Sequence, residues 1–211
     1  MQQLIARVKE IVNLCWGSFS AKVGGDLLLI NKEASMQLHF AYILKNSMDL
    51  VIHHSNESVS IELEKGILVN QRMRECDIII RIKKDEEEVI LPIEMKCYKT
   101  ISSSGKLRGA QDLFRYGIYE DLELLESYTN ICENRLLGIQ LTMTDNRNFV
   151  YPKSKKGKSW NYDVSHDTVI KNGIEINIPI GGKQASAKLK HSYHFKWVTV
   201  GKFYFLKLEA L

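Results

Sequence analysis

The sequence lacks the features that mark zinc-finger, secreted and membrane-spanning proteins. No two of its four cysteines form a Cys-x-x-Cys pair, and none has a histidine at zinc-finger spacing, which argues against a structural zinc site. No run of eighteen apolar residues occurs, so we expect no membrane span and no membrane partner. The apolar pattern over 2–16 contains Arg7, Lys9 and Glu10, so it is not the apolar segment of a secretion signal.

The composition is that of an ordinary globular protein. Of the 211 residues, 45% are hydrophobic and 26% are charged, which is enough to bury a sizeable core in a single domain over 1–211. The net charge of +4 is compatible with a polyanionic partner but does not identify one. Cys76 and Cys97 lie inside apolar strand patterns and are expected to be small buried thiols. That favours a reducing, cytoplasmic location.

The stretch from Val89 to Tyr98 organises the rest of the chain. Its residues alternate between an apolar set and a second set that ends in Glu94 and Lys96, which predicts a strand with these two charges on one face. Bare charges are costly to bury, so this pair needs partners or a function. An ion pair at a strand end is the simplest alternative.

Hydrophobic periodicity predicts a core over 30–143. The expected elements are a helix over 32–48 with Asn31 as its N-cap, a strand over 58–64 closed by a turn at Lys65-Gly66, a strand that begins at Ile67 or Glu75 and ends at Ile82, a charged tip over 83–88, the strand over 89–98, a helix over 106–127 and a strand over 135–143. This order predicts an α/β fold (α+β by some schemes) with a central mixed sheet covered by helices on both faces.

Two further segments flank that core. Residues 1–29 are expected to form a helix over 2–16 and a polar connection over 18–25. Residues 144–211 read as a β-rich extension of the same sheet. We expect a hairpin over 168–180 around Asn172-Gly173, a loop over 181–190 and a C-terminal hairpin over 193–208.

Three carboxylates are expected to lie near one another. Asp77 is the only charge within an apolar strand core, and sixteen residues separate it from Glu94. Glu33 shares a helix face with apolar residues, although a glutamate in a first helical turn also interacts with the helix dipole. Carboxylates brought close together repel unless a cation lies between them, and Mg²⁺ is a hard cation that prefers oxygen ligands. Lys96 is then placed to orient a water or to stabilise a phosphate.

Asp77 followed after sixteen residues by Glu94-Met95-Lys96 resembles the signature of the PD-(D/E)XK nuclease superfamily. The element order over 30–143, with Glu33 on the first helix, is similar to the common core of that superfamily and implies a restriction-endonuclease-like fold. Cys76 stands where the family name has proline. A subgroup of the family carries a Gln and a Tyr one helical turn apart, but here Tyr116 follows Gln111 by five residues.

The resemblance implies a role for each residue of the motif. Asp77 and Glu94 would bind Mg²⁺, for which Mn²⁺ could substitute, and the backbone carbonyl of Met95 would be a further ligand. Glu33 would reach the ion directly or through water, and Lys96 would position the attacking water. No small-molecule cofactor is expected.

The implied function is hydrolysis of DNA phosphodiester bonds by an endonuclease of the restriction or defence kind, with a possible homodimer as its active form. The alternatives are an exonuclease or junction resolvase of DNA repair or recombination, and a catalytically inactive nucleic-acid-binding or assembly module with the same fold. An accidental motif on another α/β fold is a third alternative.

Two groups of residues are candidates for contact with DNA. Arg108, Gln111 and Arg115 fall at helical spacing on one expected stripe, which could meet backbone phosphates or be a solvated face. A lysine-rich segment could attract phosphates or be simple surface; its members are Lys153, Lys155, Lys156 and Lys158. Glu75 shares a strand face with Asp77 but is expected to lie at the surface.

Overall fold

The computed structural model describes residues 1–69, 71–102, 104–128, 134–182 and 184–211. In chain order its elements are α1 (Gln2–Gly24), α2 (Glu33–Ser47), η1 (Met48–Val51), β1 (Glu57–Val69), β2 (Arg72–Lys84), β3 (Glu87–Tyr98), α3 (Gln111–Tyr128), β4 (Ile139–Thr144), α4 (Arg147–Val150), η2 (Lys158–Asn161), β5 (Val169–Ile170), β6 (Ile174–Asn177), β7 (Ser186–Leu189), β8 (Tyr193–His194), β9 (Val198–Val200) and β10 (Phe203–Leu208).

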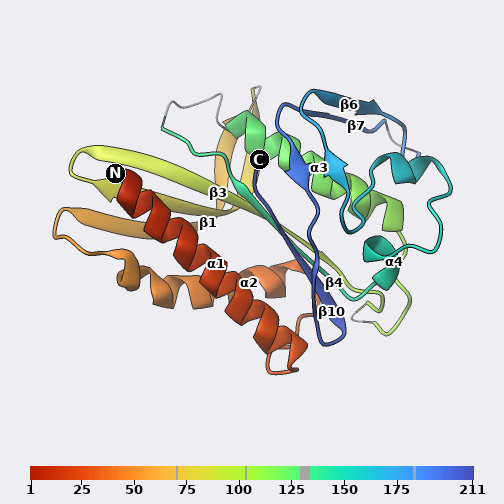
Figure 1. The fold of residues 1–211 in the computed structure, drawn as a ribbon, viewed down its shortest axis with the longest axis horizontal. Coiled ribbons are helices and arrows are strands. Elements are labelled where there is room, and N and C mark those ends of the chain that lie inside the picture. The colour runs from red at the N-terminus through yellow and green to blue at the C-terminus, as the bar shows by residue number, and fades with distance from the viewer. Residues whose placement is uncertain (70, 103, 129–133, 183) are drawn as a thin grey trace.

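A six-stranded mixed sheet forms the centre of the molecule (Figure 1). Its strand order is β1-β2-β3-β4-β10-β9. β3 and β4 pair in parallel, and the other neighbours pair antiparallel. Every residue of β4 is buried, as expected for an interior strand covered on both faces. The predicted α/β class and mixed sheet are therefore confirmed.

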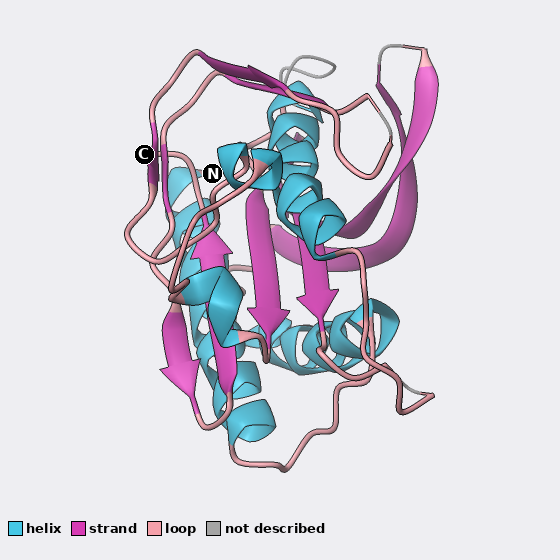
Figure 2. Cartoon of the chain, turned by 90° about the vertical axis from the view of Figure 1, so that its right-hand side faces the viewer, coloured by secondary structure: helices cyan, strands magenta, loops and turns pink. Residues whose placement is uncertain are grey.

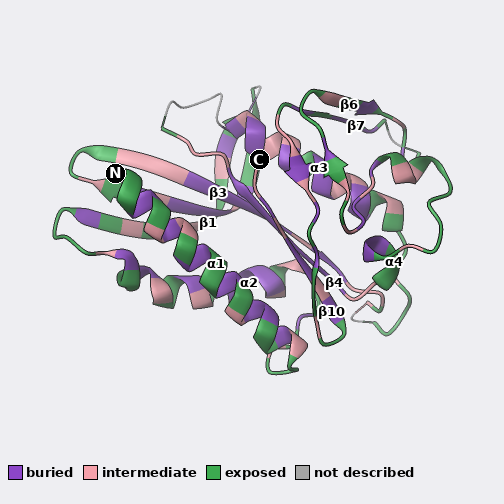
Figure 3. Ribbon diagram, viewed as in Figure 1, coloured by how far each residue is buried: buried purple, intermediate pink, exposed green. Residues whose placement is uncertain are grey.

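Alternation along β3 separates the two faces of the sheet. Leu91, Ile93 and Met95 belong to the hydrophobic core beneath α1 and α2. Glu94 and Lys96 point the other way, into a pocket that α3 also lines. Figure 3 shows the buried residues concentrated where the strands cross between the helices. The predicted common face for Glu94 and Lys96 is thus present.

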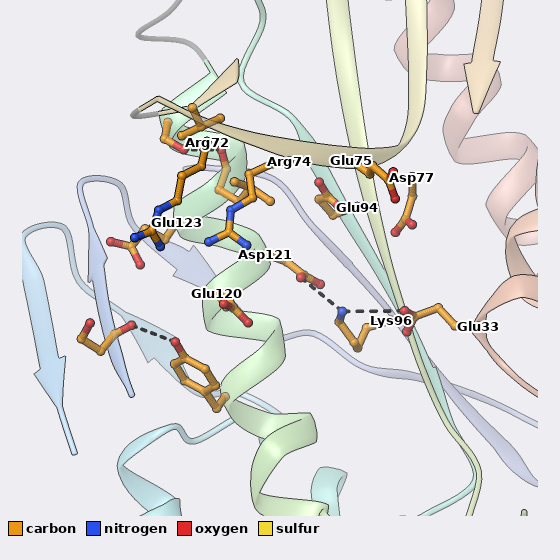
Figure 4. A pocket seen from close by; sticks show the side chains of 15 residues that line it. Glu33, Arg72, Arg74, Glu75, Asp77, Glu94, Lys96, Glu120, Asp121 and Glu123 are labelled. Atoms are coloured by element: carbon orange, nitrogen blue, oxygen red, sulfur yellow. Dashed lines mark hydrogen bonds and ion pairs between the residues drawn. The ribbon is translucent and has the colours of Figure 1, made fainter. Parts of the chain in front are cut away.

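The β1–β2 hairpin runs well beyond the sheet. Pairing between β2 and β3 begins at Ile78 and Ile93, whereas pairing between β1 and β2 continues to Val69 and Arg72. We call residues 65–69 and 71–76 the arm. The arm curves away from β3 and over α3, as Figures 2 and 4 show.

The N-terminal helix is longer than predicted. The expected polar connection over 18–25 is wrong, because Phe19 and Val23 continue the buried stripe of α1 as far as Gly24. Phe19 packs against the rings of Phe40 in α2 and Phe205 in β10. Contact with two distant elements therefore keeps this segment helical.

Asn31 is not the N-cap of α2. The cap is Lys32, and the helix runs over Glu33–Ser47. The hydroxyl of Ser35 accepts hydrogen bonds from the backbone N–H groups of both Asn31 and Lys32. This side chain satisfies donors at the helix start from within the first turn, so the helix begins one residue later than the sequence suggests.

The predicted turn at Lys65-Gly66 is also wrong. Both residues stay in β1 and pair with Cys76 and Glu75. The charged tip over 83–88 is mostly strand as well, because the β2–β3 ladder continues to Lys84 and Glu87 and leaves a two-residue turn. Cross-strand pairing overrides local turn propensity at both places.

The third helix and the strand after it both begin later than predicted. Residues 106–110 are not helical, since Ile101 and Leu107 form an isolated bridge and Arg108 N–H donates to the carbonyl of Thr100. α3 starts at Gln111. β4 starts at Ile139, not at 135.

The β-rich extension completes the main sheet. β10 pairs antiparallel with β4, and β9 lies outside it. The predicted hairpin over 168–180 is wrong, because β5 pairs with β8 and β6 pairs with β7. β7 occupies part of the segment expected to be a loop. The C-terminal hairpin is present in shorter form as β9 and β10.

Within the described part of the chain, none of the helices combines the length and the apolar character needed to cross a bilayer.

Two glycines in α1 should respond oppositely to substitution by alanine. A Cβ at Gly24 would lie 2.5 Å from Cγ1 and 2.7 Å from the carbonyl oxygen of Val200, whereas a Cβ at Gly17 meets nothing within 4 Å. Gly24→Ala is expected to lower the free energy of unfolding by about 1–3 kcal/mol through overpacking. Gly17→Ala should raise it by about 0.5–1 kcal/mol through helix propensity. Urea unfolding measures both, and equal midpoints would contradict the close approach of α1 to β9.

Candidate active site

The candidate site lies where β2 separates from β3. The last paired residues are Ile78 and Ile93, so Asp77 and Glu94 face each other at the first unpaired position. Met95 N–H donates to Asp77 Oδ2 at 2.7 Å. The side-chain amide of Gln37 donates to the carbonyl oxygen of Asp77 at 2.8 Å. These bonds hold Asp77 at the fork between the two strands.

Glu94 is buried with little to stabilise a negative charge. It is 5% exposed, and its Oε1 accepts a hydrogen bond from the hydroxyl of Tyr128 at 2.7 Å. Burial, followed by repulsion from Asp121 and Asp77, raises the pKa of Glu94 to about 9. Burial and the nearby Glu33 carboxylate also raise the pKa of Asp77.

Lys96 lies between two carboxylates from different helices (Figure 4). Its Nζ is 3.3 Å from Asp121 Oδ1 on α3 and 3.8 Å from Glu33 Oε1 on α2. Burial alone would lower the pKa of Lys96, but these two carboxylates outweigh it and raise that pKa. The other oxygen of Glu33, Oε2, accepts the backbone N–H of Cys97 at 2.9 Å. The predicted residues Glu33, Asp77, Glu94 and Lys96 therefore line one pocket.

Asp121 is a site residue that the sequence reading missed. It is 6% exposed, and its Oδ2 is buried without a hydrogen-bond partner among the described residues. Burial, and secondarily repulsion from Glu33, raises the pKa of Asp121 to about 7 against the lowering effect of Lys96. The available signal was its spacing, since it follows Phe114 by seven residues and Ile118 by three. That spacing places the Asp121 carboxylate on the apolar face of α3.

The pocket has a volume of about 760 Å³ and three walls. β2 and β3 supply its floor, α3 supplies one side, and the arm supplies another through Val69, Arg72 and Arg74. Ser186 of β7 also lines the pocket. A cavity of this size is in the usual range for ligand sites.

The donor chemistry of the pocket fits a hard divalent cation. Its lining brings the carboxylates of Glu33, Asp77, Glu94 and Asp121 together with the single ammonium of Lys96; Glu94 and Asp121 are buried, whereas the Glu33 side chain is 41% exposed. Burial, followed by repulsion from neighbouring carboxylates, raises the pKa of Glu94, and Oδ2 of Asp121 has no hydrogen-bond partner among the described residues, so both groups would be stabilised by a cation. Among the described residues, however, no three His, Cys, Asp or Glu side chains are grouped closely enough to hold a metal ion as they stand. Mg²⁺ as cofactor, and the Met95 carbonyl as a ligand, stay predictions.

The predicted Arg108–Gln111–Arg115 stripe is wrong. Arg108 precedes the helix, and its guanidinium lies over the ring of Tyr98. Arg115 is 5% exposed, donates to Ser159 and lies 4.5 Å from the ring centroid of Trp160. The guanidinium of Arg115 is therefore engaged by residues of the extension over 144–211. None of the three lines the pocket.

The lysine-rich segment lies outside the pocket. Lys153, Lys155, Lys156 and Lys158 are exposed, and Lys155 pairs with Asp163 at 2.6 Å. Their contact with DNA stays a prediction. The expected surface position of Glu75 is confirmed, although this residue also lines the pocket.

Comparison with known proteins adds no family. No protein-family model matches the chain, and searches of the curated proteins and of the solved structures find no significant match. Functional assignment therefore depends on the residues and geometry of the pocket itself.

Ion binding should be visible as thermal stabilisation. Mg²⁺ or Mn²⁺ is expected to raise the melting temperature of the wild-type protein, because an ion that binds only the folded state at a hundredfold excess over Kd adds about 2.7 kcal/mol. Glu94→Gln should lose this shift and be at least as stable as wild type without the ion, since it removes a buried carboxylate. Glu120→Gln, at an exposed position of the same pocket, is the control. Equal shifts in all three proteins would contradict an ion site at Glu94.

Proposed function

We propose that this protein is a Mg²⁺-dependent nuclease that hydrolyses DNA phosphodiester bonds, as an endonuclease of the restriction or defence kind. The observation that supports this most directly is the convergence of Asp77, Glu94 and Lys96 with Glu33 and Asp121 in one pocket. These residues come from two strands and two helices, so their meeting is a property of the fold and not of one motif.

The carboxylates and the lysine have different roles in the proposed reaction. Asp77 and Glu94 would hold the ion at the fork between β2 and β3. A bound ion would act as a Lewis acid that stabilises negative charge on the phosphate. A lysine ammonium has three donors. Asp121 lies within hydrogen-bond distance of the Lys96 ammonium, whereas Glu33 at 3.8 Å is a longer ion pair. An N–H that Asp121 does not engage would orient a water for in-line attack on phosphorus. The water oxygen would bond to phosphorus while one of its protons passes to solvent. The bond from phosphorus to the leaving sugar oxygen would break, and that oxygen would take up a proton from solvent.

A non-catalytic nucleic-acid-binding module is the second candidate. It is favoured by the absence, within the described residues, of a ready three-carboxylate metal group. The two functions differ in one observable property, since only the nuclease changes the covalent state of DNA.

Wild-type protein is expected to nick or linearise supercoiled plasmid in Mg²⁺ and to be inactive in EDTA. Lys96→Ala should cut at least about a hundredfold more slowly, because it removes the group that orients water and meets developing charge. Lys83→Ala, at an exposed position toward the other end of β2, should cut normally. Gel electrophoresis measures the rates. Indistinguishable rates for wild type and Lys96→Ala would refute the proposal, and persistent plasmid with tight DNA binding would favour the non-catalytic module.

Asp121→Asn tests the residue that aligns Lys96. The amide keeps the shape of the side chain but lacks the charge that fixes the ammonium, so we expect a loss of about tenfold to a hundredfold in kcat with little change in KM. Single-turnover and steady-state cleavage separate these two quantities. An unchanged kcat in a correctly folded Asp121→Asn protein would contradict its positioning role.

Linear, branched, single-stranded and RNA substrates extend the assay. Cleavage confined to ends would favour an exonuclease, and cleavage confined to four-way branches would favour a junction resolvase. Cutting of circular plasmid supports the endonuclease.

A further inference from the structure

Two arginines on the arm point into the candidate active site. Arg72 and Arg74 lie two residues apart at the start of β2, and both line the pocket (Figure 4). Both are exposed. Neither is paired with a carboxylate of the described residues within 4.0 Å, although Glu75, Glu120 and Glu123 line the same pocket. The two guanidinium groups therefore keep their hydrogen-bonding capacity for another partner.

The arm holds these arginines in place. Ile67 and Val69 on β1 are buried in a cluster with Leu125 and Tyr128 of α3. The β1–β2 ladder continues through Val69 and Arg72. Because the arm is both paired and packed, little ordering is needed when a ligand binds.

The two arginines indicate what that ligand is, although acidic side chains outnumber basic ones in the pocket as a whole. Among the described lining residues, Arg72, Arg74 and Lys96 are the only basic side chains. Lys96 already faces Asp121 and Glu33, so the two arginines are the free cations. A guanidinium matches the two oxygens of a phosphate with a pair of parallel hydrogen bonds. Arginines whose role was only to offset nearby acids would be expected in ion pairs with them.

We propose that Arg72 and Arg74 bind backbone phosphates of the nucleic-acid strand, adjacent to the bond that is presented to Lys96. The nucleic-acid strand lies in the pocket between the arm and α3. This inference rests on the proposed nuclease function, from which it takes the position of the scissile phosphate. It adds the arm as an element that binds the substrate.

The test is binding of a short fluorescein-labelled oligothymidylate, followed by fluorescence anisotropy. Calcium replaces magnesium, a parallel series contains EDTA, and the length of the oligonucleotide is checked on a gel after each titration. Arg72→Gln/Arg74→Gln is expected to raise Kd at least tenfold. It should also reduce the salt dependence of log K by about 1.4, since each lost phosphate contact on a single strand contributes about 0.7.

Lys22→Gln/Lys45→Gln is the matched control, because it removes the same charge from exposed positions of α1 and α2 outside the pocket. It should change Kd less than threefold. Thermal unfolding verifies that both double variants fold. The proposal is overturned if the arginine variant binds within twofold of wild type, or if the two double variants lose equal affinity, which would mean that net charge alone is responsible.

This measurement separates the inference from the function on which it rests. Normal cleavage and binding by the arginine variant would reject the arm contact and leave the nuclease intact. If binding depends on the two arginines but the protein never cleaves DNA, the nuclease function is rejected and the proposal that the arm binds nucleic acid is retained.

Discussion

The constraint on which the site depends is uncompensated negative charge beneath α3. Burying a charged group is unfavourable unless a partner or a metal neutralises it. Here Glu94 and Asp121 are buried, and burial, followed by repulsion from neighbouring carboxylates, raises the pKa of both although the ammonium of Lys96 lies nearby. A structural ion pair would need only one acid for one lysine. The excess of acid is the property of the pocket from which we propose that it binds a cation.

Separation of β2 from β3 makes that arrangement accessible. If the β2–β3 ladder continued past Ile78 and Ile93, backbone groups at the fork would pair with each other, and Met95 N–H would no longer be free for the Asp77 side chain. Instead β2 stays paired with β1 and bends over α3, so that one hairpin both opens the fork and forms a wall. The same geometry brings Arg72 and Arg74 to the acidic pocket. The arm therefore places the proposed phosphate-binding arginines next to the proposed catalytic residues.

Errors in the sequence reading have a common origin. At Lys65-Gly66 the β1–β2 ladder overrides local turn propensity, and helical spacing does not indicate that the extension buries Arg115 against Ser159. Asp121 was visible as an acid on an apolar helix face, but its role depended on Lys96 being opposite. The contacts of Arg115 and of Asp121 join segments far apart in the chain.

The amino-acid sequence by itself determined the alternation of the 89–98 strand, the shared face of Glu94 and Lys96, the apolar stripe beside Glu33 and the mixed order of the core elements. These follow from the periods of strand and helix, which are local properties of the backbone. Only the tertiary structure decided that Asp121 pairs with Lys96, that the arm leaves the sheet at Asp77 and that its arginines enter the pocket. Those features depend on which surfaces pack together, and packing is settled by the whole chain at once.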